Sequence, residues 1–140
     1  MGLVEKAERK SRARAILSYL LAAMLLVSAV LAIAGHSEGA SRLAPWFVMI
    51  GLTALNLTSL PFRWRSYGEV SKLMNDETTR DHRRSSFAAG FWAMFAAAVV
   101  VMIIASFSPI DAVAIGRITI TAGLTAALVA FATLELRASR

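Results

Sequence analysis

Residues 75–92 read NDETTRDHRRSSFAAGFW, and this stretch decides how the rest of the chain is interpreted. Six of its first ten residues are charged, whereas apolar residues dominate from Phe87 to Phe107. An abrupt change of this kind is typical of a helix that leaves water and enters membrane hydrocarbon. We therefore predict a helix that begins near Glu77, crosses the membrane surface and continues without a break to about Phe107.

Four segments are apolar over about the length of a membrane-spanning helix: residues 15–35, 43–62, 87–107 and 114–134. A helix rises 1.5 Å per residue and needs roughly 20 apolar residues to cross about 30 Å of hydrocarbon. Strands of a membrane barrel are about half as long and alternate polar with apolar residues. The sequence therefore predicts an all-α polytopic membrane protein with four transmembrane helices in one membrane domain, residues 1–140.

The composition agrees with this class and argues against several kinds of site. Hydrophobic residues make up 57% of the 140 residues, charged residues make up 17%, and the mean hydropathy is +0.61. A soluble domain usually has about 25% charged residues. Cysteine is absent, which excludes disulfides, thiolate metal sites and cysteine nucleophiles. Because the sequence also lacks a glycine-rich phosphate loop and a Ser/His/Asp set, we expect no enzyme activity, no cofactor and no metal.

The positions of the basic residues predict the orientation. Of the 15 Lys and Arg residues, all but Arg42 and Arg117 precede the first segment, lie between the second and third, or follow the fourth. Lys and Arg resist translocation, so the side that carries the majority is predicted to be cytoplasmic. Both termini are then cytoplasmic, and the four helices form two hairpins in the cell inner (cytoplasmic) membrane. The net charge of +6 faces anionic lipid headgroups, and nucleic acid is not an expected partner.

The cytoplasmic loop between the second and third spans, residues 63–86, is the largest segment outside the membrane. Apolar residues that include Trp64 and Tyr67 recur there every three or four positions, which predicts a short amphipathic helix. Such a helix lies in the membrane interface, with its aromatic rings at headgroup level. Either Asn75 or Asp76 suits the N-cap of the third helix that follows.

Charged residues at the start of the third helix extend this surface. The negative charge of Glu77 interacts favourably with the positive end of the helix dipole. Arg83 and Arg84 are placed to contact lipid phosphates. We expect this surface to contact lipid or a protein partner through Trp64, Tyr67, Asp76, Glu77, Arg80, Arg83 and Arg84. Glu77, Asp81 and His82 are also a conceivable cation site, but the arginines around them favour a salt-bridged, solvated helix end.

Polar residues inside the predicted spans are few, and none in the interior of a span is Asp, Glu, Lys or Arg. Asn56 is the most costly to expose to lipid, so we expect it to turn inward and hydrogen-bond another helix. Thr119 and Thr125 would join it as the polar lining of a transport path. Coupled proton transport usually needs an ionisable group within the membrane, and only Glu135 and Asp111 lie near its margins.

Small residues recur at intervals of four in the last two spans. They are Ala89, Ala93 and Ala97 in the third, with Ala122, Ala126 and Ala130, or Thr119, Gly123 and Ala127, in the fourth. Faces of this kind let helices approach closely and gain dispersion contact in lipid. Two interpretations remain open, namely packing within one bundle and a homodimer formed through the third and fourth helices.

The segment DETTRDHRR, directly before a span, resembles a feature of small bacterial four-span membrane proteins of unassigned function. In these proteins an Asp-Glu-x-x-Arg motif opens the third helix, and Asp76, Glu77 and Arg80 match it here. Some such proteins are associated with helix-turn-helix regulators. The resemblance therefore implies that the cytoplasmic loop is a docking surface.

Two functions fit these observations. The first is a non-enzymatic regulatory or accessory protein that uses residues 63–86 for interaction. The alternative is a small oligomeric transporter or channel subunit. The two functions differ in whether the polar residues within the membrane line a continuous water-filled path or hydrogen-bond to one another. An enzyme acting on lipid would need Glu77, Asp81 and His82 to converge, and we do not expect it.

Overall fold

In a computed structural model, the described residues 3–34, 40–58 and 77–138 form four helices. These are α1 (Leu3–Ala34), α2 (Ala40–Thr58), α5 (Glu77–Ala105) and α6 (Ala112–Ala138). Side chains are described for residues 9, 12–34, 44–58 and 80–138. The predicted all-α class is confirmed for this part of the chain.

Three of the helices are long and apolar enough to cross a membrane, over Arg12–Ala34, Arg80–Ala105 and Ala112–Ala138. This finding supports the assignment to the membrane proteins. The apolar part of α2 is shorter and covers Ala44–Thr58. The second predicted span, residues 43–62, ends beyond the described residues, so the four-span topology stays a prediction. The cytoplasmic orientation of the termini also stays a prediction.

The ends of α5 and α6 follow from local hydrogen bonds. α5 begins at Glu77, as predicted, and ends at Ala105, two residues before the expected end. α6 begins at residue 112 because the carboxylate of Asp111 accepts the backbone N–H of Val113 at 3.0 Å and of Ala114 at 3.3 Å. Asp111 is therefore the N-cap of α6, which satisfies two N–H groups that the helix itself leaves without acceptors.

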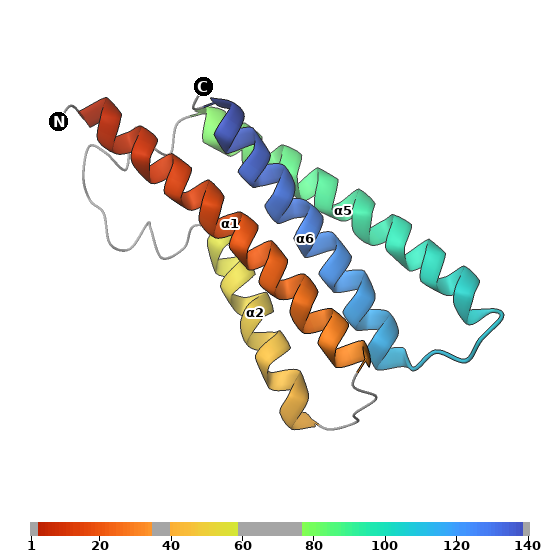
Figure 1. The fold of residues 1–140 in the computed structure, drawn as a ribbon. Coiled ribbons are helices and arrows are strands. Elements are labelled where there is room, and N and C mark those ends of the chain that lie inside the picture. The colour runs from red at the N-terminus through yellow and green to blue at the C-terminus, as the bar shows by residue number, and fades with distance from the viewer. Residues whose placement is uncertain (1–2, 35–39, 59–76, 139–140) are drawn as a thin grey trace.

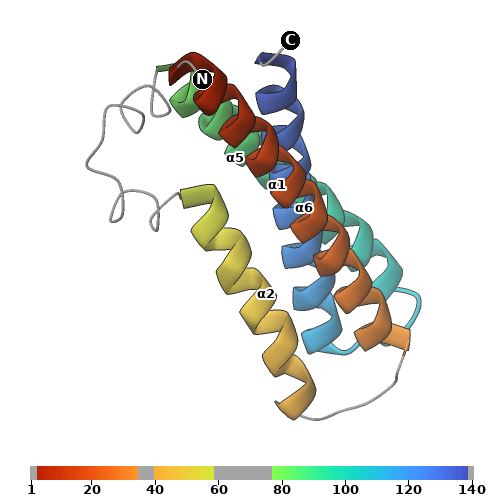
Figure 2. The same cartoon turned by 60° about the vertical axis from the view of Figure 1, so that its left-hand side comes forward.

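α6 is the central helix of the bundle. It lies between α1 and α5 and packs against both, whereas α2 lies on the outside, against α1 and more locally against α6 (Figures 1 and 2). The N-terminus of α1, the start of α5 and the C-terminus of α6 meet at one end of the bundle (Figure 1). We call this the basic end. The start of α2 and the connection between α5 and α6 lie at the opposite end, which we call the turn end.

The backbones of α5 and α6 approach closely at two glycines. A Cβ atom added to Gly90 would lie 2.8 Å from the carbonyl oxygen of Gly123 and 2.9 Å from the Cβ of Ala127. A Cβ added to Gly123 would lie 2.9 Å from the Cβ of Met94. One of the two small-residue faces of α6, the one containing Gly123 and Ala127, thus packs against α5 within the chain. A homodimer through other faces of these helices stays a prediction.

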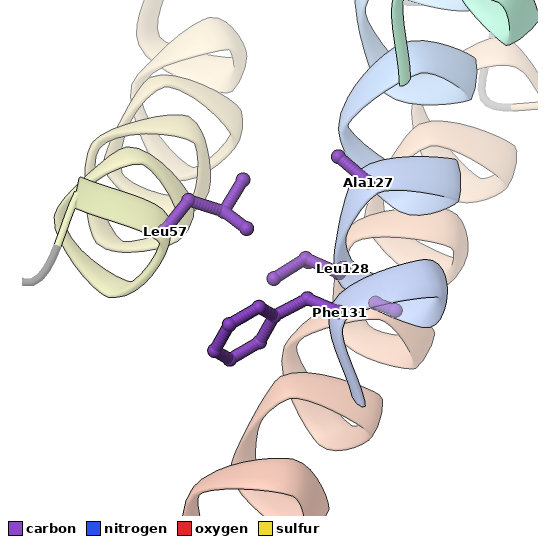
Figure 3. Close-up of a cluster of buried hydrophobic side chains, with 5 residues drawn as sticks. Leu57, Ala127, Leu128 and Phe131 are labelled. Atoms are coloured by element: carbon purple, nitrogen blue, oxygen red, sulfur yellow. The ribbon is translucent and has the colours of Figure 1, made fainter. Parts of the chain in front are cut away.

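Buried apolar side chains join α1, α2 and α6 near the middle of the bundle. Leu57 of α2 points toward Leu128 and Phe131 of α6 (Figure 3), and Ala22 of α1 and Ala127 complete the cluster. Most other large apolar side chains of the described helices are exposed on the surface of the protein. A surface this apolar is stable in hydrocarbon and unfavourable in water, which agrees with a membrane protein.

The close approach of α5 and α6 predicts that Gly→Ala substitutions at this contact affect stability differently from those at other glycines. We expect Gly90→Ala and Gly123→Ala to lower the free energy of unfolding, because forcing packed helices apart costs about 1–3 kcal/mol, more than the gain in helix propensity. Gly51→Ala and Gly116→Ala are matched controls, since a Cβ at either position would have no heavy atom within 4 Å beyond the adjacent residues and its own helix backbone. Unfolding by SDS in micelles, followed by circular dichroism, measures all four. Equal stability of the four variants would contradict the packing described here.

Candidate functional site at the basic end

The structure places the predicted contact residues in different environments. Trp64, Tyr67 and Asp76 lie outside the described residues, as does the side chain of Glu77, whose backbone begins α5. Arg80 and Arg84 are exposed on α5, whereas Arg83 is half-buried. Three neighbouring arginines therefore differ in burial, and only Arg83 turns toward the rest of the bundle.

Arg83 belongs to a charged cluster that sequence reasoning did not identify. Its other members are Arg14 of α1 and Glu135 of α6, so three helices contribute one residue each. The side chain of Glu135 is only 7% exposed and interacts electrostatically with both guanidinium groups. We call Arg14, Arg83 and Glu135 the charged cluster.

The side chain of Arg14 is positioned by two residues of α6. Its Cζ atom lies 5.3 Å from the centre of the Phe131 ring, and Glu135 follows Phe131 by four residues. Residues four apart share one face of a helix, so the same face offers Arg14 an aromatic ring and a carboxylate. The contact joins α1 to α6 at the basic end and accounts for the burial of Glu135.

Small buried serines lie one turn beyond each arginine of the cluster. Ser18 donates a hydrogen bond to the carbonyl oxygen of Arg14 at 3.0 Å, and Ser86 donates to the carbonyl oxygen of His82 at 2.6 Å. Both serine side chains are fully buried. Since their hydroxyls bond to their own helices, they let neighbouring helices pack closely and leave no polar group unsatisfied.

Positive charge exceeds negative charge within the charged cluster. Two guanidinium groups share the single carboxylate of Glu135, and burial removes part of the hydration of both arginines. Arg14 also repels Arg83 electrostatically. In addition, the buried Nε of Arg83 has no hydrogen-bond acceptor. The arrangement is chemically suited to an anion that approaches Arg83.

A second contact between helices lies near the turn end and was also not predicted. The indole N–H of Trp46 in α2 donates to the hydroxyl oxygen of Thr121 in α6 at 3.2 Å. The Cζ atom of Arg117 lies 5.8 Å from the centre of the Trp46 ring. The only hint in the sequence was the spacing of Arg117 and Thr121, four residues apart on one helix face.

Most of the described polar groups within the apolar helices bond to a neighbouring helix or to their own backbone. Oδ1 of Asn56 lies 3.5 Å from the hydroxyl of Ser18 in α1. The hydroxyls of Tyr19 in α1 and Thr133 in α6 lie 2.8 Å apart. Thr133 also donates to the carbonyl oxygen of Val129 at 2.7 Å, so Tyr19 is the donor of the pair.

Two threonines depart from this pattern. The hydroxyls of Thr53 in α2 and Thr125 in α6 are buried and have no hydrogen-bond partner. Thr119, the other threonine predicted to line a path, is half-buried. Within the described residues, no three His, Asp or Glu side chains lie close enough to hold a metal ion. Asp81 is exposed and His82 half-buried, and the side chain of Glu77 lies outside that set.

The charged cluster predicts that the carboxylate of Glu135 is needed for stability. In Glu135→Gln, two partly buried guanidinium groups remain without their shared anion. We expect the free energy of unfolding to fall by about 2 kcal/mol, less than for a fully buried pair because both arginines retain some contact with solvent. SDS-induced unfolding in micelles measures the change.

Two further variants control for this effect. Asp81→Asn removes an exposed carboxylate from α5 and should change stability by less than about 0.5 kcal/mol. Adding Arg83→Gln to Glu135→Gln removes the repulsion between arginines, so the double variant should regain part of the lost stability. A Glu135→Gln protein as stable as Asp81→Asn would show that the cluster contributes nothing to the fold.

No protein-family model, no curated protein and no solved structure matches this chain. The resemblance carried by Asp76, Glu77 and Arg80 therefore remains a prediction from a short segment.

Proposed function

We propose that the protein is a non-enzymatic accessory or regulatory protein of the bacterial inner membrane. In this proposal it spans the membrane four times, has both termini in the cytoplasm and binds a protein partner through residues 63–86. The observation that supports it most is how polar groups pair within the bundle. Ser18 lies against Asn56, Tyr19 bonds Thr133 and Trp46 bonds Thr121, all across helices. Side chains used in this way stabilise helix packing and are less available to solutes.

The position of the charges also supports this function. The loop leads directly into α5, which begins at the basic end, and Arg80 and Arg84 are exposed there. Exposed charges next to a membrane suit electrostatic attraction to a partner or to anionic headgroups. The rest of the described surface is mainly apolar and suits lipid.

A small oligomeric transporter or channel subunit is the second candidate. It is favoured by Thr53 and Thr125, whose buried hydroxyls have no hydrogen-bond partner. Buried polar groups without partners are costly and often mark a site that water or a ligand completes. Solute flux into vesicles that contain the purified protein, compared with Thr53→Val and Thr125→Val, would identify this function.

Photocrosslinking in native membranes tests the accessory function. A photoreactive residue at Met74 should capture a defined protein partner, because the loop is the proposed docking surface. The same residue at Ser108, which is exposed at the turn end, should not capture it. Glu77→Ala and Arg80→Ala should weaken capture from Met74, since they remove charges of the proposed motif.

Arg84→Ala provides the matched control, because Arg84 is exposed on the same helix but lies outside the motif. It should leave capture from Met74 largely unchanged. Crosslinks from Met74 only to lipid or to a second copy of the chain would contradict the accessory function and favour the transporter.

A further inference from the structure

Two buried arginine Nε groups lack hydrogen-bond acceptors, and the surroundings of the two arginines differ. They belong to Arg83 and Arg117. The guanidinium of Arg117 lies over the Trp46 ring, whose electron-rich face stabilises a cation. Arg83 is instead repelled by Arg14 and shares Glu135 with it. Of these two arginines, Arg83 is therefore the one that most needs an additional anion.

The surface beyond Arg83 indicates what kind of molecule carries that anion. Phe87 and Phe91 follow Arg83 on α5 at intervals of four residues, so the three lie on adjacent turns of one side of the helix. Both phenylalanines are exposed, at 50% and 56%. They lie within the apolar part of α5, which extends toward the turn end. A cation at the edge of the membrane thus continues into an exposed apolar strip.

We propose that the charged cluster binds the phosphate group of one anionic phospholipid, whose acyl chain lies along Phe87 and Phe91. Arg83 donates to the phosphate oxygens through the two terminal nitrogens of its guanidinium, a two-pronged geometry that suits guanidinium and phosphate. Arg14 adds positive charge, and Glu135 holds both arginines in position while leaving the cluster net positive.

This inference does not depend on the proposed function. A general attraction between a basic membrane protein and anionic lipid would involve the exposed Arg80 and Arg84 at least as much as Arg83. A bound lipid at the charged cluster depends on Arg83 specifically. The two arginines at positions 83 and 84 are adjacent and equally charged, so they provide the test.

The experiment uses the full chain purified in a neutral detergent and titrated with phosphatidylglycerol, with binding followed by native mass spectrometry. We expect the wild-type protein to bind one phosphatidylglycerol with preference over the zwitterionic phosphatidylcholine. Arg83→Gln should weaken this binding about tenfold, because charge-assisted hydrogen bonds are lost. Arg84→Gln should weaken it much less. Equal effects of the two substitutions would overturn the proposal.

A second variant tests the guanidinium geometry and controls for loss of folding. Arg83→Lys keeps the charge but lacks the planar fork. It should bind phosphatidylglycerol more weakly than the wild type while unfolding at a similar SDS concentration. The effect should persist at about 0.5 M salt, where attraction between exposed charges is largely screened. A lysine variant that binds phosphatidylglycerol as tightly as the wild type would show that only general electrostatic attraction to anionic lipid operates there.

Inorganic phosphate distinguishes a lipid headgroup from a free anion. Because the apolar strip contributes only when acyl chains are present, millimolar phosphate should not displace phosphatidylglycerol. Displacement that depends on Arg83 would show a site for free phosphate and would overturn the assignment to lipid.

Discussion

Where Gly90 and Gly123 face each other, α5 and α6 are so close that even one added methyl group at either position would collide with the other helix. Lipid competes for apolar surface, so helices in a membrane associate mainly through close van der Waals contact of this kind. α5 packs mainly on α6 and contacts the other helices little. Its position therefore depends on this approach, and with it the position of Arg83, seven residues before Gly90.

α6 connects the remaining helices through two pairs of residues with the same spacing. Near the basic end, Phe131 and Glu135 contact Arg14 of α1, and near the turn end Arg117 and Thr121 contact Trp46 of α2. Each pair is four residues apart and so presents one face to its partner helix. A helix that is apolar over most of its length thus contacts α1 near one end and α2 near the other through polar side chains.

Charge and hydrophobicity together relate this architecture to a function at the membrane. The charged cluster lies where α1, α5 and α6 come together near the basic end, and the exposed apolar side chains of α5 begin directly beyond it. Polar groups deeper in the bundle are largely used for contacts between helices. The charged side chains available to other molecules are therefore concentrated at the basic end, where the proposed accessory function places lipid headgroups and a partner.

The sequence by itself determined the helical class, because a long apolar run in lipid must satisfy its backbone hydrogen bonds internally. The start of α5 at Glu77 followed from the change from charged to apolar residues. Only the tertiary structure decided which residues turn inward. Helices that are apolar on every side have no periodic pattern to indicate their packed face. For that reason the sequence places Glu135 only at the end of a span and does not distinguish Arg83 from the adjacent Arg84. The packing of α1, α5 and α6 is what buries Glu135 and turns Arg83, but not Arg84, inward.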